Sequence, residues 1–260
     1  MADEVVLFEK ADGVGLITMN RPGVKNSLNL EVFRKLNDIL ERTTGDDEVR
    51  SVIITGAGNA FVAGADINDL LGFDIQMGWS ASRFQQSVFN KLERLGKPSI
   101  AAINGFAMGG GLELALSCTI RLASTNAKMG FPELGLGLIP AFGGTPRLVR
   151  TVGYARAAEL LLFHSVIDAE EAYRIGLVNR VAEQDQLQNR AQEMAQGLSA
   201  LSPVAVRLEL ELLRETENKG FDTGLALESA LAALAVSSPE AKQLLARFLS
   251  KVKEKKHLKG

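Results

Sequence analysis

The stretch that decides the fold and the chemistry of this chain is Asn104-Gly105-Phe106-Ala107-Met108-Gly109-Gly110-Gly111-Leu112-Glu113, where an apolar run breaks into three glycines and then delivers a carboxylate. Three consecutive glycines let the backbone approach a ligand closely, and they open a helix whose first N–H groups lack partners inside the helix. A second carboxylate, Glu133, follows after a predicted strand. Two carboxylates that converge on one place suggest an acid and a base for proton transfer.

A second turn of small residues, from Gly56 to Asp66, also follows a predicted strand. Taken alone, this segment is equally well explained as an ordinary tight connection between a strand and a helix. Together with the triple glycine it can bring two backbone N–H groups to one site, as an oxyanion hole requires. Simpler explanations exist for the acids too, because Glu113 can be favoured by a helix N-terminus and Glu133 can be a surface turn residue.

Strand-like and helical segments alternate along the first part of the chain. Runs rich in β-branched and aromatic residues predict strands at residues 5–8, 14–19, 51–55, 99–103 and 119–123. Apolar residues at helical spacing predict a helix that Asn29 caps and that runs to about Thr44, and a later helix over residues 79–95. This alternation is typical of an α/β fold with parallel layering.

The second part of the chain is mainly helical, with one further strand expected at residues 177–181. A composition shift near Ser199 and Pro203 predicts an α/β core over residues 1–199, which carries the site, and a helical region over residues 200–260. The helix expected at residues 225–235 is apolar over much of its circumference. It therefore needs to be covered by another element or by another subunit.

Composition limits the partners and the location of the protein. The formal net charge of −2 gives no positive field that would favour nucleic acid or an anionic membrane surface. The lone Cys118 excludes an intrachain disulfide framework and is expected to pack in the core. The acidic N-terminus lacks the pattern of a secretory signal, and no apolar run approaches the roughly 18 residues of a membrane span. We expect a cytoplasmic protein.

Other kinds of site with glycine-rich turns or metal ligands lack their required patterns. No phosphate-binding Gly-x-x-x-x-Gly-Lys-Ser/Thr motif occurs, and neither Gly56-Ala57-Gly58 nor Gly135-Leu136-Gly137 continues as a dinucleotide fingerprint. With two histidines and one cysteine, the chain supports neither a zinc cluster nor Cys–His catalysis. The sequence therefore predicts no metal site.

Four segments together carry a specific combination of residues. They are the glycine-rich stretch quoted above, Phe61-Val62-Ala63-Gly64-Ala65-Asp66-Ile67, Phe131-Pro132-Glu133 and Gly143-Gly144-Thr145-Pro146-Arg147-Leu148. In this combination the chain resembles the enoyl-CoA hydratase/isomerase, or crotonase, family over nearly its whole length. The resemblance implies a crotonase-like spiral of repeated ββα units with a C-terminal helical trimerisation region. It also implies a homotrimer or a homohexamer made of two trimers.

The resemblance assigns roles to four positions. It implies that the backbone N–H groups of Ala65 and Gly110 form an oxyanion hole for the thioester carbonyl oxygen of an acyl-CoA substrate. It implies that Glu113 is the base that assists attack of water at C3 of a 2-enoyl-CoA and that Glu133 is the acid that delivers a proton to C2. The pair favours a hydratase for short acyl chains, or the reverse dehydratase, because adding water requires both proton removal and proton delivery.

The resemblance further implies which residues contact the substrate. These are Ala63, Ala65, Asp66, Ile67, Gly109, Gly110, Pro132 and Lys25. Coenzyme A enters as part of the substrate, and neither a metal nor another cofactor is implied. Lys25 lies where the family meets the CoA moiety, although a solvated turn lysine explains it equally well. The lysine-rich run over residues 251–256 could reach CoA phosphates from a neighbouring subunit, but a basic helix end that complements the helix dipole is the simpler explanation.

The chain also departs from the pattern of many hydratases in this family. Phe131 stands where many carry glutamine, Pro146 replaces a frequent glutamine, and the C-terminus lacks the usual Glu-Lys-Arg ending. These departures leave the acyl preference open. Two alternatives use the same pocket, isomerisation of a 3-enoyl-CoA and hydration of a cyclic dienoyl-CoA. A third, RNA binding by a recruited family member, is disfavoured by the acidic charge balance and the lack of a basic stripe.

Overall fold

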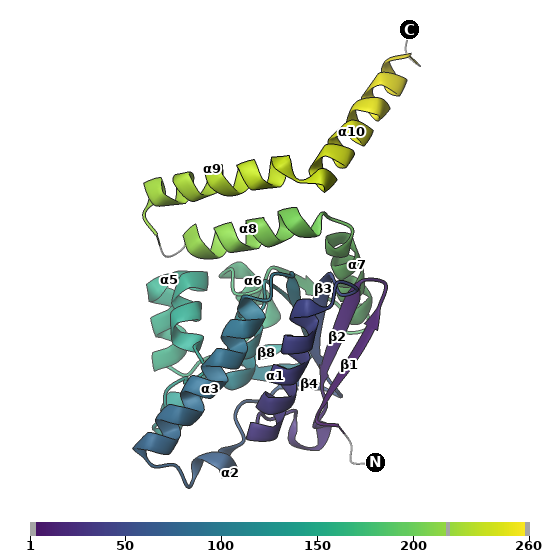
Figure 1. Cartoon of the computed structure of the whole chain (residues 1–260). Coiled ribbons are helices and arrows are strands. Elements are labelled where there is room, and N and C mark those ends of the chain that lie inside the picture. Colours follow the sequence, from purple (N-terminus) through teal and green to yellow (C-terminus); the bar gives the residue numbers. More distant parts are fainter. Residues whose placement is uncertain (1–3, 217–218, 258–260) are drawn as a thin grey trace. The chain divides into compact units, whose positions relative to one another are not determined.

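The computed structural model describes residues 4–216 and 219–257, and side chains up to residue 250. The chain divides into two compact units, Met1–Ser199 and Ala200–Gly260. In the described residues the first unit holds two β-sheets with helices, and the second consists of three helices (Figure 1). No described helix is both long enough and apolar enough to cross a membrane.

The larger sheet has six strands in the order β1-β2-β3-β5-β7-β10. Their bounds are β1 (Val6–Ala11), β2 (Val14–Met19), β3 (Ser51–Gly56), β5 (Ser99–Ile103), β7 (Ile120–Ser124) and β10 (Arg180–Ala182). Strands β1 and β2 form an antiparallel hairpin, whose turn residues Asp12 and Gly13 both have positive φ, as a type I′ turn requires. All other neighbours in this sheet are parallel.

The smaller sheet has four strands of three residues each. They are β4 (Ala60–Val62), β6 (Phe106–Met108), β8 (Lys128–Gly130) and β9 (Val166–Asp168). Strands β4, β6 and β8 are parallel neighbours, just as β3, β5 and β7 are in the larger sheet. Each turn of the chain thus adds one strand to each sheet before a helix or loop leads to the next turn. This is the predicted spiral of ββα units.

The helices of the first unit begin where the sequence supplies caps and apolar periodicity. They are α1 (Leu30–Gly45), α2 (Ile67–Leu70), α3 (Ile75–Glu93), α4 (Gly110–Leu116), α5 (Gly144–Leu162, kinked at Gly153), α6 (Ala169–Arg174) and α7 (Leu187–Ser199), with 3-10 turns η1 (Pro22–Val24) and η2 (Glu133–Leu136). The predicted cap of α1 is confirmed, because the Asn29 side chain accepts a hydrogen bond from Val32 N at 3.0 Å.

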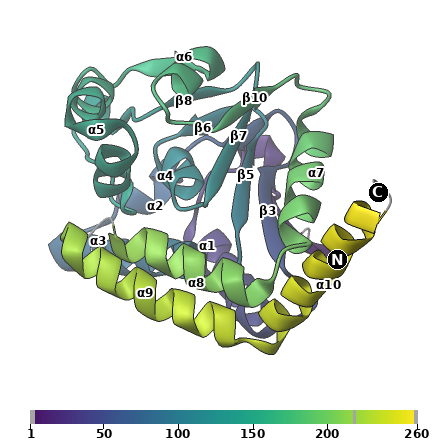
Figure 2. The same ribbon diagram turned by 90° about the horizontal axis from the view of Figure 1, so that it is seen from above.

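The two faces of the larger sheet bury different sets of residues, because successive side chains of a strand point to opposite faces. In β3, Val52 and Ile54 join the main core with α1 and α3, whereas Ile53 faces the other way. Ile53 packs in a second cluster with Leu187 and Ala191 of α7, which lies along this face of the sheet (Figure 2). With both faces covered, the central strands are buried throughout, as parallel strands usually are.

Two buried asparagine side chains tie successive turns of the spiral together. Asn104 Nδ2 donates to Gly56 O at 2.9 Å and Gly58 O at 3.0 Å, and its Oδ1 accepts from Gly56 N at 3.2 Å. Asn26 Nδ2 donates to Ala60 O at 2.8 Å. The bonds to Gly56 and Ala60 satisfy backbone groups of buried residues, and together with the bond to Gly58 they fix the turns that lead towards β4.

The structure corrects two predicted boundaries. The strand expected at residues 177–181 is the shorter β10, because Leu177 N and Val178 N both donate to Ala172 O and close the end of α6 instead. The helix expected at residues 79–95 begins earlier, at Ile75, because the Asp74 side chain caps it by accepting from Met77 N at 2.7 Å.

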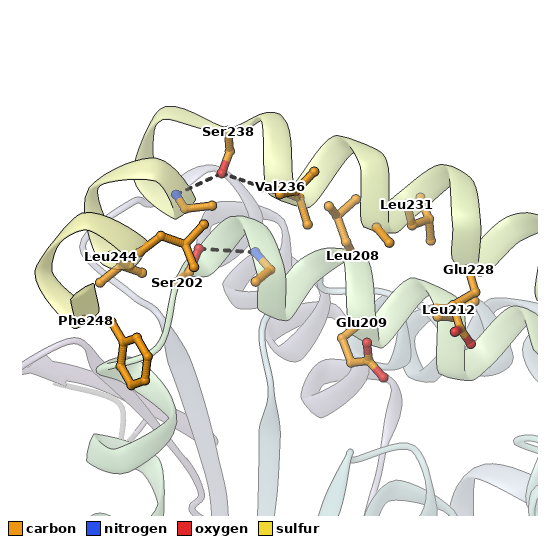
Figure 3. A pocket seen from close by; sticks show the side chains of 15 residues that line it. Ser202, Leu208, Glu209, Leu212, Glu228, Leu231, Val236, Ser238, Leu244 and Phe248 are labelled. Atoms are coloured by element: carbon orange, nitrogen blue, oxygen red, sulfur yellow. Dashed lines mark hydrogen bonds between the residues drawn. The ribbon is translucent and has the colours of Figure 1, made fainter. Parts of the chain in front are cut away.

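The second unit contains α8 (Pro203–Thr216), α9 (Phe221–Ser237) and α10 (Pro239–His257). The three helices line an apolar groove of about 630 Å³, into which leucines of α8, α9 and α10 point together with Phe248 (Figure 3). Glu209 and Glu228 are the acidic residues of its lining. The lysine-rich run considered above for CoA phosphates lies outside the side chains that the structure describes.

Candidate active site

Two turns of small residues lie side by side at the ends of neighbouring parallel strands. Strand β4 continues into Ala63, Gly64 and Ala65, and β6 continues into Gly109 and Gly110. A Cβ atom on Gly64, which has φ +120°, would meet the Met108 carbonyl oxygen at 3.3 Å. The close packing of the two turns therefore depends on glycine, and it brings two segments with free backbone groups together.

Leu28 determines the direction in which the N–H group of Ala65 points. Leu28 forms a parallel bridge to Ala65, in which Leu28 N donates to Gly64 O and Leu28 O accepts from Asp66 N, both at 2.8 Å. In a parallel bridge the residue between these two partners directs its own N–H and C=O away from the other strand. The N–H of Ala65 thus points away from Leu28, and it donates to no other residue in the described part of the chain.

The N–H group of Gly110 is free because it starts a helix. Gly110 is the first residue of α4, so its N–H has no acceptor within the helix. Gly109 precedes it with φ +49° and ψ −119°, a conformation that L side chains rarely adopt, and is held by a bond from its own N to Gly130 O at 2.9 Å. A Cβ atom on Gly109 would also collide with the Glu133 carboxylate. The backbone conformation therefore favours glycine strongly, and a side chain here would displace the Glu133 carboxylate.

Glu113 is a buried carboxylate one turn into α4, with an exposed fraction of 1%. Its Oε1 accepts from Phe142 N at 2.8 Å and from Gly144 N at 2.7 Å. Burial raises the pKa of Glu113 to about 7, although these two N–H donors and the Arg147 cation oppose the rise, while the charge of Glu133 adds to it. Glu113 can therefore exchange a proton near neutral pH.

Glu133 begins the 3-10 turn η2 and is half-buried. Its carboxylate lies against the backbone of Gly109, and its buried Oε2 has no hydrogen-bond partner among the described residues. Burial raises the pKa of Glu133, and a backbone hydrogen bond only partly opposes this. The two predicted carboxylates thus lie close enough for their charges to interact.

The remaining predicted site residues surround these turns but differ in what they contact. Ala63 N donates to Lys25 O at 3.0 Å, so it fixes the turn. The Asp66 carboxylate pairs with Arg21 at 3.2 Å and accepts from Asn68 at 3.1 Å, so it is directed at its own chain.

Ile67 and Pro132 present exposed surface beside the site, and Ile67 has an exposed fraction of 56%. Lys25 is also exposed, and its Nζ lies 4.8 Å from the centre of the Phe106 ring, over the start of β6. The lysine therefore has a defined contact at the rim of the two turns, which the sequence did not indicate.

Known proteins share both this sequence and this fold. The family model described as enoyl-CoA hydratase/isomerase matches residues 9–257. A short-chain-enoyl-CoA hydratase of Clostridium acetobutylicum is 43% identical over 95% of each chain. The chain belongs to the enoyl-CoA hydratase/isomerase family. Further members are a crotonyl-CoA hydratase of Syntrophomonas wolfei, 38% identical over 97% of this chain and 98% of the relative, and an enoyl-CoA hydratase of Bacillus anthracis. The crystal structure of the latter has a TM-score of 0.92 at 35% identity, over 95% of this chain and 96% of that one.

The fold and the family predicted from the sequence are confirmed, and the chain spans nearly the whole length of these enoyl-CoA hydratase relatives. The site contains groups that the sequence reasoning missed. The backbone of Phe142 and Gly144 holds Glu113, and the buried Arg147 contacts the same turn. The segment from Gly143 to Leu148 was noted only as a family signature. A glycine pair just before a helix, as in the triple-glycine turn, was the signal that could have identified it as a second source of free N–H groups.

Proposed function

We propose that this chain is an enoyl-CoA hydratase that reversibly adds water across the C2=C3 double bond of a short 2-enoyl-CoA thioester to give a 3-hydroxyacyl-CoA. The hydratase activity is supported by relatives at 38–43% identity over nearly the full chain. The observation that carries the mechanism is the pair Glu113 and Glu133, two carboxylates with raised pKa values beside a turn with a free N–H group. Burial raises both pKa values, and the value of about 7 for Glu113 suits proton exchange by this residue near neutral pH.

The N–H groups of Ala65 and Gly110 bind the thioester carbonyl oxygen. When water attacks C3, electrons move through C2 onto this oxygen, and the enolate that forms carries a negative charge there. Two preorganised donors stabilise the charged enolate oxygen more than they stabilise the neutral carbonyl oxygen. One such donor lowers the activation barrier by about 2.7–4 kcal/mol in comparable sites. No side chain is needed for this task, which fits the presence of alanine and glycine.

The two glutamates complete the proton transfers. Glu113, ionised, accepts a proton from the water whose oxygen bonds to C3. Glu133, protonated, delivers its proton to C2, so that the enolate collapses to the 3-hydroxyacyl thioester. One proton enters Glu113 and one leaves Glu133, and the two carboxylates return to their starting states by proton exchange through the site before the next turnover. Because their charges interact, the pH profile reports the pair rather than either residue alone.

Coenzyme A arrives as part of the substrate, and the addition of water requires no redox cofactor because substrate and product are at the same overall oxidation level. We assign Ala63, Gly109, Ile67 and Pro132 to the surface along which the thioester lies, and Lys25 to the CoA end. The support for Lys25 is its exposed position over Phe106. Asp66 serves by holding the Ala65 turn through Arg21 rather than by contacting the substrate.

The helical unit over residues 200–260 acts as the oligomerisation region of a homotrimer or a hexamer of two trimers. Its support is the apolar groove of about 630 Å³ between α8, α9 and α10 (Figure 3). Large side chains along these helices are exposed, among them Phe248 at 65% and Leu234 at 58%. Apolar surface of this extent usually marks an interface between proteins.

Hydration of crotonyl-CoA tests the proposal directly, through the loss of absorbance of the conjugated thioester. Glu113→Gln and Glu133→Gln should each lower kcat by about 100-fold or more, because each removes one proton transfer. Circular dichroism should show the parent fold in both variants. Glu170→Gln, which changes an exposed glutamate of α6, is the matched control and should keep the parent rate.

Two results would contradict the assignment. Near-parent rates in both glutamine variants would show that these residues are not the acid and the base. If the parent converted a 3-enoyl-CoA to its 2-enoyl isomer faster than it hydrated crotonyl-CoA, the chain would be an isomerase of the same family, and product analysis over a small acyl-CoA panel distinguishes the two.

A further inference from the structure

Arg147, in the first turn of α5, is a buried arginine directly behind the turn that holds Glu113. Its exposed fraction is 7%. Its Nη1 donates to the carbonyl oxygens of Phe142 at 3.3 Å and Gly143 at 3.4 Å. The same short turn offers the N–H groups of Phe142 and Gly144 to Glu113 on its other side. The guanidinium of Arg147 thus binds the carbonyl groups of this turn, and the carboxylate of Glu113 binds its N–H groups.

The guanidinium is itself fixed by α3. Nη2 of Arg147 donates to Glu93 Oε2 at 2.6 Å and to Asn90 Oδ1 at 2.6 Å, and Nε donates to Glu93 Oε2 at 3.1 Å. Arg147 is buried, and its two partners, Asn90 and Glu93, lie in the last turn of α3. Charge-assisted bonds of this kind are stronger and more directional than neutral ones.

The side chain of Phe142 anchors the turn from a second direction. Its ring packs against Phe33 of α1, with ring centres 5.2 Å apart, and against Phe89 of α3, with ring centres 6.1 Å apart. Gly143, between the two donors, has φ +101°, and a Cβ atom there would collide with the Arg147 guanidinium. The turn is thus shaped to fit the arginine.

We propose that Arg147 is a positioning residue for the catalytic base: held by Glu93 and Asn90, it fixes the turn from Phe142 to Gly144 so that two N–H groups bind one oxygen of Glu113 and leave the other free to accept a proton from water. The inference rests on the proposed hydratase function, in which Glu113 is the base. Arg147 contacts neither the two turns of the oxyanion hole nor the substrate surface described above, so it acts through Glu113 alone.

The charges around Glu113 give the proposal a measurable consequence. Glu133 of η2 and Arg147 of α5 face Glu113, and Glu93 of α3 faces Arg147. The Arg147 cation and the N–H groups of the turn both favour the ionised form of Glu113 and hold its pKa down against burial. Without the cation and the ordered turn, the pKa of Glu113 rises, and the base becomes available only at higher pH.

The variants that test this are Arg147→Met, which removes the charge and the hydrogen bonds, and Arg147→Lys, which keeps the charge but cannot reproduce the fork of donors. Arg156→Met, an exposed arginine of the same helix that pairs only with Glu159 among the described residues, is the matched control. Crotonyl-CoA hydration is measured from pH 5.5 to 9.5 to give kcat and KM separately. A pKa increase of about one unit follows from the loss of a neighbouring cation.

For Arg147→Met we expect kcat at pH 7 to fall roughly 10- to 100-fold with KM nearly unchanged, since the base is misplaced and the thioester site is intact. At alkaline pH about fivefold of this loss should be recovered. The reason is that the acidic limb of the pH profile of kcat, which reports the pKa of Glu113, moves to higher pH by about one unit. Arg147→Lys should lose kcat with a smaller shift of the limb, and Arg156→Met should match the parent.

A direct readout does not depend on turnover. In protein labelled at the glutamate δ-carbon, with the resonance assigned through Glu113→Gln, the pKa of Glu113 should be higher in Arg147→Met than in the parent. An unchanged Glu113 pKa together with a uniform loss of kcat at all pH values would overturn the proposal and leave Arg147 as part of the scaffold only. A parent protein without hydratase activity would instead refute the proposed function, while the titration would still decide whether Arg147 controls Glu113.

If Arg147→Met does not fold, Glu93→Gln decides the question with the opposite sign. Glutamine keeps hydrogen-bonding atoms near the guanidinium but no longer neutralises it, so the cation acts more strongly on Glu113. The pKa of Glu113 and the acidic limb of kcat should then move downward. No shift in either would show that the pair of Glu93 and Arg147 is electrostatically uncoupled from the base, against the proposal.

Discussion

Glu113 can change its protonation state near neutral pH because it is deeply buried. Burial disfavours the charged form of a carboxyl group, and this is the largest influence on the Glu113 pKa. The two N–H groups of Phe142 and Gly144 recover part of the lost solvation. The balance leaves a base that is ionised in a useful fraction of molecules, at a cost to the stability of the folded state.

This cost predicts that Glu113→Gln stabilises the protein at alkaline pH. The folded-state pKa of about 7 lies above the ordinary value of 4.5. The unfolded chain therefore gives up this proton at lower pH, and the folded state of the parent loses stability as the pH rises from 4.5 through 7. Glutamine does not ionise. The free energy of unfolding of Glu113→Gln, relative to that of the parent, should therefore increase by up to about 3 kcal/mol between pH 4 and pH 8.

Urea unfolding at both pH values and at equal protein concentration measures this difference. Glu170→Gln serves again as the control, because its exposed side chain should give the same small difference at pH 4 and pH 8. A stability difference for Glu113→Gln that does not depend on pH would mean that Glu113 is not held at a raised pKa.

At the residue scale, the sequence predicted positions that follow from a local pattern and missed those that depend on distant contacts. Gly110 and Glu113 belong to one glycine-rich stretch, and Glu133 follows the next predicted strand, so all three were predicted from the sequence itself. The family resemblance then implied which glutamate is the acid and which is the base. Their catalytic roles stay predictions. The donors Phe142 and Gly144 lie 29 and 31 residues from Glu113 in the chain. No periodicity connects such segments, and only the folded structure shows that they meet.

At the element scale, the long helices were predicted from their apolar period and the longer strands from runs rich in β-branched residues, whereas the short strands were not predicted. Helix α1 and strands β2, β3 and β5 were found almost residue for residue. Each strand of the smaller sheet has only three residues, which is too few for an alternating pattern to be recognised. Yet this sheet aligns the two turns of the candidate site. Its position follows from the packing of successive ββα turns, not from local propensity.

The hydrogen bonds by which Asn104 links successive ββα turns can be tested by mutation. Asn104→Ala should lower the free energy of unfolding by about 2 kcal/mol or more, because it leaves the N–H and C=O of the buried Gly56 without partners, at about 1–3 kcal/mol for each buried group. Because Gly56 leads into the Ala65 turn, kcat should fall as well.

The matched control is Asn189→Ala, on the exposed side of α7, where little stability should be lost. Urea midpoints and crotonyl-CoA rates compare the two variants. If Asn104→Ala unfolded at the same urea concentration as Asn189→Ala, the ties between turns would contribute nothing to the stability of the spiral.

At the scale of the whole molecule, the two units differ in how they bury apolar residues. The first unit holds both hydrophobic clusters. In the second unit, Gly224 is the only buried residue among those whose side chains the structure describes. Three helices without a buried core of their own cannot supply much folding free energy, since a domain of this size is marginal even with a core. The unit therefore needs a partner surface, which is consistent with the proposed oligomer.

Light scattering after size-exclusion chromatography tests this need. The parent should have the mass of a trimer or a hexamer, and Leu244→Glu, in the groove lining of α10, should form smaller species, because burial of an unpaired carboxylate at an apolar interface costs several kcal/mol in each subunit. Gln243→Glu introduces the same charge one position earlier on the same helix, outside the groove lining, and should keep the parent mass. A monomeric parent, or a Leu244→Glu variant of unchanged mass, would show that the groove is not an interface between copies of this chain.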